Sequence, residues 1–377
     1  MVERKSIGLY YNYNKEWIAG TYYILNIIKA LNKLTDREKP FLVIFYNNHS
    51  EISLVKELAY PYISFFKFKT YSNVIYRIVN KIAKLTGFDT VFYDRKPSQM
   101  LKKYYPYNYQ LKNFSENFVW IPDFQEHFYP EFFSLVEVAN RKKNHAITAV
   151  SGKNIVFSSE DAKENFTRFY PNNTCKLHVL KFASVLSDTF TKISIESLLL
   201  KYNIQNPYFI ISNQFWKHKN HITVLKAIVE IKKLNNTICF VFTGKPKDTR
   251  DANFFKELIY FCDEHKINNQ VKFLGFIDRE EQLQLMNNSE AIIQPSLFEG
   301  WSTTVEDAKF LNKFIILSDI PLHREQMKDN VIFFSKQNEK ELASLILEFV
   351  RKCPHKTAND YNTNIVKFAK EFVEIMS

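Results

Sequence analysis

Short apolar runs alternate with segments of helical spacing along most of the chain. In the first half, strands are predicted at the runs SIGLYYN, FLVIFY, FVWIP, NIVFSS and KLHVLKF, and helices at residues 19–33, 130–144 and 160–169. The second half repeats this alternation more cleanly. There, strands are predicted at YFIISN, TICFVFTG, VKFLG, EAIIQP and FIILSD, and helices at 221–234, 252–265, 279–287, 303–311 and 338–351.

This alternation predicts the fold class. Apolar runs without a polar face belong to strands buried on both sides, and their alternation with helices is typical of parallel βαβ sheets. Two such halves predict an α/β fold with two doubly wound domains. A polar stretch between Ser184 and Asn206 predicts the boundary, with an N-terminal domain at 1–185 and a C-terminal domain at 186–358. The final segment, 359–377, has helical spacing without a strand partner, so it could cap either domain.

Composition narrows the class further. The 377 residues suffice for about two domains. Only 7 glycines are present, where an average usage of roughly 7% would give about 26, so a glycine in a loop is informative. The 4 cysteines form no CxxC or Cys/His ligand spacing, which favours a reducing compartment with no disulfide frame and no zinc site. No apolar run reaches about 18 residues and no signal peptide is recognisable, so we expect a cytoplasmic protein.

The net charge of +11 is uneven. Residues 1–200 carry 27 Lys and Arg against 18 Asp and Glu, or +9, and the remaining 24 and 22 give +2. A basic half favours an anionic partner such as nucleic acid, phospholipid or a phosphorylated substrate, although the charge could serve solubility alone. No RNP, zinc-finger or helix-turn-helix signature is present, so we do not expect a nucleic-acid partner.

Ligands of open α/β sheets bind at the carboxyl ends of strands, so chemistry is expected in the strand-to-helix loops. The loop Pro295–Thr304 contains Gly300 and then the helix-capping hydroxyls of Ser302, Thr303 and Thr304. A helix N-terminus offers unpaired N–H groups and the positive end of a dipole, which suit an anion such as a diphosphate. The alternative is an ordinary capped helix.

Two adjacent acids follow in that helix. At about 100° per residue, Glu306 points opposite the apolar stripe, whereas Asp307 lies on its flank. A flank position can reach a ligand at the edge of a cleft. The spacing therefore prefers Asp307 for chemistry and predicts that Glu306 mostly faces water.

Two other loops carry candidate residues. The loop Ser212–His221 holds Lys217 and Lys219, which compete for the role of a mobile phosphate-binding charge, unless both are simply solvated. The loop Trp120–Ser134 holds His127 among aromatic residues. Such a histidine is more often a hydrogen-bonded structural residue, but this loop follows a strand and would face the cleft.

The chain resembles a known family most strongly at PSLFEGWSTTVEDAKFLNKFIILSDIPLHREQ. This stretch is similar to the signature of retaining GT-B glycosyltransferases of the family-4 type, the group 1 transferases, in which seven residues separate two acids. Glu299 and Asp307 match the two acids, and Glu306 takes a position that is usually apolar. The resemblance implies that Glu299 binds hydroxyls of the donor sugar and that Asp307 accepts hydrogen bonds from the ribose.

The stretch NQFWKHKNH resembles the Lys-Asn motif of the same family and places Lys219 at the diphosphate-binding lysine. The family usually has an Arg five residues earlier; this position is Gln214 here, and Lys217 is the candidate substitute. Three further segments are similar to the glycine-bearing first loop, the loop whose His touches the donor sugar, and the base-binding segment. They contain Gly20, His127, Gly275 and Phe276.

The resemblance implies a GT-B architecture, in which two Rossmann-like domains face a central cleft and the last helix crosses back to the N-terminal domain. It implies a nucleotide-sugar donor held mainly by the C-terminal domain, a glycan or lipid-linked glycan acceptor, no cofactor and no metal site. The expected catalytic residues are Glu299, Lys219 and His127. The expected donor-binding residues are Gly20, Lys217, Gly275, Phe276, Gly300, Ser302, Thr303, Thr304, Asp307 and Glu306.

Two alternatives remain open. A catalytically silent GT-B relative could bind a nucleotide sugar without turnover, and Gln214 is the residue that favours it. The segment Val74–Leu85 combines an apolar stripe with Arg77, Lys81 and Lys84, so it could dock on an anionic membrane surface or pack on the sheet. The first option predicts a peripheral protein on the inner membrane face.

Overall fold

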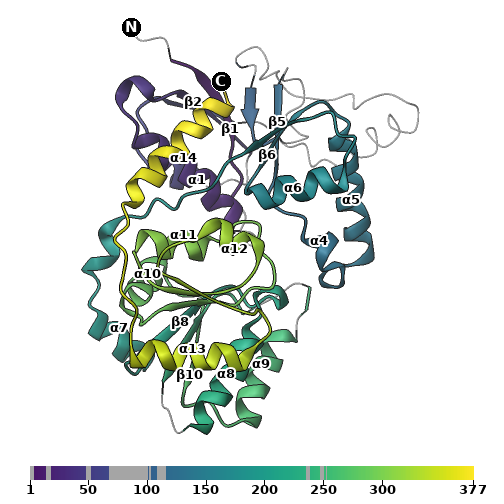
Figure 1. The fold of residues 1–377 in the computed structure, drawn as a ribbon. Coiled ribbons are helices and arrows are strands. Elements are labelled where there is room, and N and C mark those ends of the chain that lie inside the picture. Colours follow the sequence, from purple (N-terminus) through teal and green to yellow (C-terminus); the bar gives the residue numbers. More distant parts are fainter. Residues whose placement is uncertain are drawn as a thin grey trace.

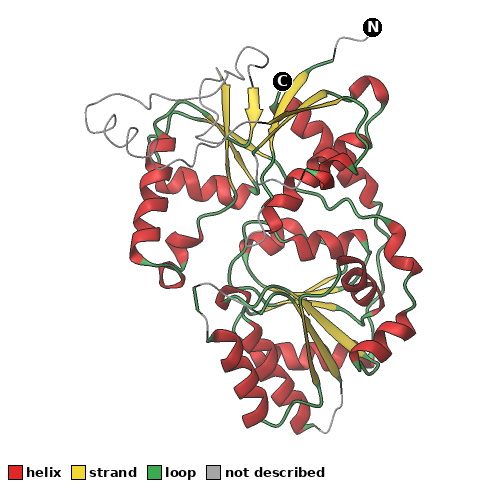
Figure 2. Ribbon diagram, turned by 180° about the vertical axis from the view of Figure 1, so that it is seen from behind, coloured by secondary structure: helices red, strands yellow, loops and turns green. Residues whose placement is uncertain are grey.

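The computed structural model describes residues 4–13, 18–47, 52–67, 101, 103–107, 116–234, 238–246, 250–251 and 253–377. These residues form two α/β domains, each with a parallel sheet and helices around it (Figure 1, Figure 2). The segment predicted to be amphipathic, Val74–Leu85, lies outside the described residues.

The described strands of the N-terminal domain form one seven-stranded sheet in the order β3-β2-β1-β4-β5-β6-β7, and its neighbouring strands are parallel. The order changes direction between β1 and β4, which is the kind of switch point where such sheets bind ligands. The strands are β1 (Ser6–Tyr10), β2 (Phe41–Tyr46), β3 (Ile63–Lys67), β4 (Lys103–Tyr105), β5 (Glu116–Ile121), β6 (Asn154–Phe157) and β7 (Lys176–Val179). The helices are α1 (Ile18–Asn32), α2 (Ser53–Lys56), α4 (Gln125–Phe128), α5 (Leu135–Ala149) and α6 (Glu160–Phe169).

The C-terminal domain has a six-stranded parallel sheet in the order β10-β9-β8-β11-β12-β13, with its switch point between β8 and β11. Its strands are β8 (Tyr208–Ser212), β9 (Cys239–Thr243), β10 (Val271–Gly275), β11 (Ile292–Gln294), β12 (Ile315–Ser318) and β13 (Val331–Phe334). Its helices are α7 (Ile195–Tyr202), α8 (His221–Lys233), α9 (Phe254–Glu264), α10 (Arg279–Asn288), α11 (Thr303–Phe310), α12 (Pro321–Gln326) and α13 (Glu339–Arg351).

The two parallel sheets and their helices confirm the predicted fold class. Strands β8 and β9 are buried at every residue, as their continuous apolar runs indicate. The helix predicted to begin at residue 130 instead begins at Leu135. Pro130 belongs to a separate 3-10 turn, and the Ser134 hydroxyl caps α5 by accepting a hydrogen bond from the Glu137 N–H (3.2 Å). Several short elements were not predicted, among them β3, β4, β13 and α12.

The last helix, α14 (Tyr361–Ile375), packs on α1 of the N-terminal domain, where Figure 1 shows it beside that helix. Its buried residues Ile365, Phe368 and Phe372 join the core beneath α1. At its start, the Tyr361 hydroxyl accepts a hydrogen bond from the Ser184 N–H (2.9 Å). The chain thus crosses between the domains after β7 and again before α14, and the two crossings touch each other.

Among the described residues, no helix combines the length and the apolar character needed to cross a membrane.

Candidate functional site

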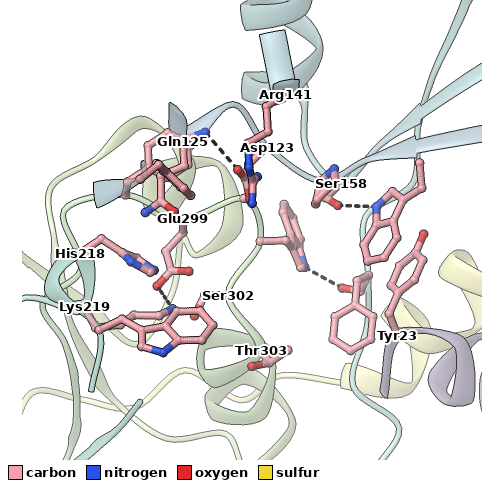
Figure 3. A pocket seen from close by; sticks show the side chains of 18 of the residues that line it. Tyr23, Asp123, Gln125, Arg141, Ser158, His218, Lys219, Glu299, Ser302 and Thr303 are labelled. Atoms are coloured by element: carbon pink, nitrogen blue, oxygen red, sulfur yellow. Dashed lines mark hydrogen bonds and ion pairs between the residues drawn. The ribbon is translucent and has the colours of Figure 1, made fainter. Parts of the chain in front are cut away.

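A cavity of about 570 Å³ lies between the two domains. The N-terminal domain lines it with the loop after β5 and with α5, and the C-terminal domain lines it with the loops after β8 and β11. Figure 3 shows Lys219 and Glu299 on one wall and Asp123 and Arg141 on the other. The cavity therefore sits at the carboxyl ends of strands from both sheets, where the sequence predicted chemistry.

Glu299 is the acid at the centre of the C-terminal wall, and its side chain is buried. Its Oε1 lies 2.6 Å from the Lys219 Nζ, and the same oxygen accepts hydrogen bonds from the Ser296 hydroxyl (2.6 Å) and the Gln294 Nε2 (2.8 Å). Burial alone would raise the pKa of this carboxyl, but the Lys219 ammonium and the Ser296 hydroxyl bring the pKa below its usual value. Glu299 is therefore an ionised carboxylate near pH 7.

Lys219 reaches Glu299 because the loop after β8 is held in one conformation. Asn220 adopts a left-handed backbone conformation (φ 56°), which ends the turn containing Lys219 and starts α8. The Asn220 side chain donates hydrogen bonds to the backbone oxygens of Pro295 (3.0 Å) and Lys336 (2.7 Å). The asparagine of the Lys-Asn motif thus fastens the lysine loop to the glutamate loop.

The N-terminus of α11 opens on the same cavity. Ser302 caps it by accepting a hydrogen bond from the Val305 N–H. The Gln326 side chain of α12 makes two hydrogen bonds to the backbone of Ser302. Its Oε1 accepts one from the Ser302 N–H (3.1 Å), and its Nε2 donates one to the Ser302 backbone oxygen (2.8 Å). Thr303 and Thr304 line the cavity in the first turn, where backbone N–H groups lack partners within the helix. This end of α11 can receive an anion.

Gly300 lies where the two walls come close together. A Cβ atom at this position would lie 2.7 Å from the Pro122 oxygen and 2.8 Å from the Asp123 Oδ2. No other residue type fits without moving the N-terminal loop. Burial raises the pKa of the Asp123 carboxyl, which faces this contact.

The N-terminal wall contains residues that the sequence did not single out. Glu137, Arg141 and His145 of α5 all line the cavity, and their spacing of four residues puts them on one face of the helix. This polar stripe on a helix next to a strand-to-helix loop is the signal that could have found them. Arg141 Nη2 is 3.0 Å from Glu137 Oε1, so the Arg141 guanidinium forms an ion pair with a carboxylate of the same wall.

His127 does not line the described cavity, which corrects its predicted placement. Its ring stacks on Phe169 with centroids 4.0 Å apart, and its Nε2 lies 3.7 Å from the Glu126 Oε1. The cause is the single turn of α4, which turns His127 toward α6 while Gln125 lines the cavity. His145 is the histidine that the N-terminal wall presents instead. Contact between His127 and a donor sugar stays a prediction.

The prediction that Glu306 faces water is wrong. Its side chain is 1% exposed and accepts hydrogen bonds from the Gln326 Nε2 (2.9 Å), the Lys309 Nζ (2.9 Å) and the Tyr361 hydroxyl. The helix angle was read correctly, but α14 begins over that face of α11 and covers it. Glu306 therefore joins α11 to α12 and to the crossing before α14, which is a structural role.

Asp307 is also buried, and both of its oxygens have partners. Oδ1 accepts a hydrogen bond from the Ser184 hydroxyl (2.9 Å), and Oδ2 pairs with the Arg279 Nη2 (2.6 Å). Ser184, Glu306, Asp307 and Tyr361 form the contact where the two crossing segments meet, which we call the joint. Asp307 does not line the described cavity. Its predicted contact with a ribose stays a prediction.

The remaining predicted residues lie around the site. Lys217 pairs with Asp251 (2.6 Å) and lines a neighbouring cavity. Gly275 ends β10 with a φ of 68°, and the Phe276 side chain is 71% exposed beside it. Gly20 lies in the first turn of α1 and is buried. None of these four is among the residues that line the interdomain cavity in the described part of the chain.

The solved structures similar to this chain define the class of its fold. Alr3699/HepE from Anabaena, in complex with UDP and glucose, superposes with a TM-score of 0.68 at 14% identity, covering 98% of this chain and 99% of that one. A glycosyltransferase from Rickettsia africae gives a TM-score of 0.59 at 16% identity over 99% and 94% of the two chains. The lipopolysaccharide outer core galactosyltransferase WaaB gives 0.55 at 14% over 98% of both. The protein has the GT-B fold, with two Rossmann-like domains.

The sequence comparisons narrow the class beyond the fold. Residues 200–368 match the family model of the glycosyl transferases group 1. The O-antigen chain mannosyltransferase RfbU from Salmonella typhimurium is 23% identical over 188 residues, which are 46% of this chain. The match spans 50% of the length of that relative. Together with the fold, these findings support the class of GT-B glycosyltransferases.

Proposed function

We propose that this protein is a retaining hexosyltransferase that moves a sugar from a nucleotide-sugar donor to a glycan or lipid-linked glycan acceptor. We further propose that the transfer step uses no metal ion and no cofactor, and that the product belongs to a cell-surface polysaccharide. The family match at 200–368 supports the reaction class. The names of two relatives, an O-antigen mannosyltransferase and a lipopolysaccharide galactosyltransferase, support the acceptor class.

The observation that carries this proposal is the Lys219–Glu299 pair beside the N-terminus of α11 in the interdomain cavity. Breaking a sugar–phosphate bond places new negative charge on the leaving diphosphate. A diphosphate at α11 would draw the Lys219 ammonium toward itself, and the first-turn N–H groups of Thr303 and Thr304 would share the charge. Because the N–H groups are already in place and Lys219 has only to turn, these donors stabilise the charge as it develops.

The same movement would free Glu299 for the sugar. In the ligand-free site its Oε1 is engaged by Lys219, Ser296 and Gln294. When Lys219 turns to the diphosphate, Glu299 keeps its two neutral donors and can accept hydrogen bonds from sugar hydroxyls. A carboxylate oxygen held by several donors is a weak nucleophile. We therefore assign Glu299 to sugar binding, and retention to attack of the acceptor on the face that the diphosphate leaves.

The first test is donor binding. One solved neighbour, Alr3699/HepE, was crystallised with UDP and with UDP-glucose, so UDP-glucose, UDP-galactose and a mannosyl nucleotide form the first panel for thermal shift. A ligand at 100 times its dissociation constant stabilises the folded state by about 2.7 kcal/mol. Turnover is then measured as donor hydrolysis without acceptor, and the anomeric configuration of the released sugar is read by NMR before it mutarotates. Failure of every donor to bind the folded protein would contradict the proposal.

A catalytically silent nucleotide-sugar-binding protein is the second candidate. Gln214 favours it, because this residue stands where the resemblance expects a second cation for the diphosphate. The two candidates differ in one result: the silent protein would bind a donor in the thermal-shift assay but would neither hydrolyse nor transfer it. Replacement of Gln214 by Arg should increase donor affinity if this position faces the diphosphate.

A further inference from the structure

A second cluster of polar side chains lies behind the N-terminal wall. Glu126 and His127 of α4 and His145 of α5 each direct one ligand atom to a common point, and these atoms lie within 4.8 Å of one another. The Glu126 Oε1 is 3.2 Å from the His145 Nδ1 and 3.7 Å from the His127 Nε2. No member of the cluster has a role in the transfer step proposed above, and an ion bound here would exclude the predicted contact of His127 with the donor sugar.

The acid of this cluster is buried, and its nearest polar partners are the two histidine rings. Glu126 is 0% exposed, and within the described residues neither of its oxygens has a hydrogen bond. The His127 Nε2 and the His145 Nδ1 are also buried and without hydrogen bonds in the same part of the chain. Three polar atoms that face one another in a dry place are costly unless something between them satisfies all three.

The surroundings of the cluster are aromatic. The His127 ring stacks on Phe169. The His145 and Phe124 rings form a T-shaped pair with centroids 5.0 Å apart. These rings limit the access of water and hold both imidazoles in place. Their orientation directs a nitrogen of each toward the Glu126 carboxylate, as the short nitrogen–oxygen distances show.

A divalent cation fits this arrangement. Imidazole nitrogens and a carboxylate oxygen are zinc ligands, and bonds of about 2.0–2.2 Å in a tetrahedral site put ligand atoms roughly 3.3–3.6 Å apart. The two Glu126 distances, 3.2 and 3.7 Å, lie close to that range, and the two imidazole nitrogens lie within 4.8 Å of each other. A cation would also neutralise the buried carboxylate.

We propose that Glu126, His127 and His145 bind a divalent transition-metal ion of the zinc type, with a water in the fourth position. The ion links the single turn of α4 to α5, and both elements carry residues of the cavity wall, Gln125 on α4 and Arg141 on α5. Its role is to position that wall. The transfer step remains free of metal, because the Lys219–Glu299 pair lies on the opposite wall.

The experiment uses the full chain after treatment with a chelator. Zn²⁺ is titrated by calorimetry, Co²⁺ is titrated by its visible absorption, and Tm is measured with and without Zn²⁺. We expect one ion per chain, a tetrahedral Co²⁺ spectrum, and a rise in Tm of about 5–10 °C at a free Zn²⁺ concentration 100 times the dissociation constant. Nucleotide-sugar binding is measured in parallel, so that failure of the metal site and failure of the proposed function are distinguished.

Two variants test the ligands. Glu126→Gln keeps the size of the side chain and removes its charge, so the variant should lose the Zn²⁺ response while its metal-free Tm equals or exceeds that of the metal-free parent. His127→Gln/His145→Gln should lose the Co²⁺ spectrum. The matched control, His178→Gln/His265→Gln, removes two histidines elsewhere and should keep both responses.

Three results would overturn the proposal. The first is the absence of saturable binding of one Zn²⁺ or Co²⁺ per chain in the parent protein. The second is undiminished binding in both ligand variants, which would assign the ion to surface histidines. The third is a metal-free Glu126→Gln variant that is less stable than the parent and a parent that ignores Zn²⁺. This third result would mean that Glu126 and His145 form an ordinary ion pair.

Discussion

The two walls of the interdomain cavity are built differently. On the C-terminal wall, hydrogen bonds of the buried Gln294 connect the Lys219–Glu299 ion pair to Ser302, and Gln326 bonds to Ser302 from behind. The N-terminal wall contains aromatic rings, the buried carboxyl of Asp123, the Arg141–Glu137 pair and His145 of α5. The first wall is preorganised for one charged group, whereas the second offers surface to a variable partner. Under the proposed function, the nucleotide would bind to the first wall and the acceptor to the second.

The largest expected effect concerns the charged wall. Lys219→Ala should lower turnover by roughly 10²–10³, which is the loss found when one stabiliser of developing charge is removed. Lys217→Ala is the matched control, because its side chain pairs with Asp251 in another cavity. Steady-state donor hydrolysis or transfer measures both. If Lys217→Ala is inactive and Lys219→Ala is nearly normal, the wrong lysine has been assigned to the diphosphate.

The next effect concerns the joint behind that wall. Glu306→Gln should lower the free energy of unfolding by about 1–3 kcal/mol, because it weakens hydrogen bonds of a buried carboxylate to Lys309 and the Tyr361 hydroxyl. Denaturant unfolding measures the loss, and Glu348→Gln on an exposed position of α13 is the control with no expected change. An unchanged free energy in Glu306→Gln would show that the joint does not depend on this acid.

A pH change should affect the C-terminal domain through His221. Burial lowers the pKa of this histidine to about 3, whereas an unfolded chain has a value of about 6.5. The unfolded state therefore binds more protons between these two values, and stability falls as pH decreases through that window. At pH 5 this residue should cost about 2 kcal/mol relative to pH 7.

The control for that pH effect is a residue that cannot titrate. In His221→Gln, the difference in unfolding free energy between pH 7 and pH 5 should be smaller than in the parent by about the same 2 kcal/mol. His265→Gln, at an exposed position, should leave the difference unchanged. Equal pH dependence in His221→Gln and the parent would contradict the assignment.

The smallest effect concerns the outer face of the N-terminal domain. On α5, the apolar side chains of Leu135 and Val136 are 89% and 71% exposed, and Lys142 and Lys143 are exposed on the same helix. If this domain docks on an anionic membrane, each lysine should contribute about 1 kcal/mol. Co-sedimentation with anionic liposomes should then decrease in Lys142→Gln/Lys143→Gln and at high salt, and stay unchanged in Lys340→Gln/Lys352→Gln. A protein that stays in the supernatant at low salt would favour a soluble saccharide acceptor.

The difference between local sequence rules and long-range contacts explains which parts of the fold and the site could be predicted from the sequence. The strands of the second sheet and the start of α11 follow from local rules, because a buried parallel strand reads as an apolar run and Ser302 is a standard cap. Glu299 and Lys219 carry a motif with fixed spacing, so their pairing was predictable in kind. Glu306 was not, since only the return of α14 covers it. His145 was missed because the predicted helix ended at residue 144, one residue before it, whereas α5 continues to Ala149.

The crossing segments have a mechanical consequence. Two segments of the chain join the domains, one after β7 and one before α14. They meet where the Tyr361 hydroxyl accepts a hydrogen bond from the Ser184 N–H. Two tethers at a single place permit the domains to rotate about that place but oppose their sliding or separation. Any opening of the cavity is then a swing whose pivot is braced by Glu306 and Asp307. Because these two acids sit at the pivot, substitutions there should alter how widely the two domains separate.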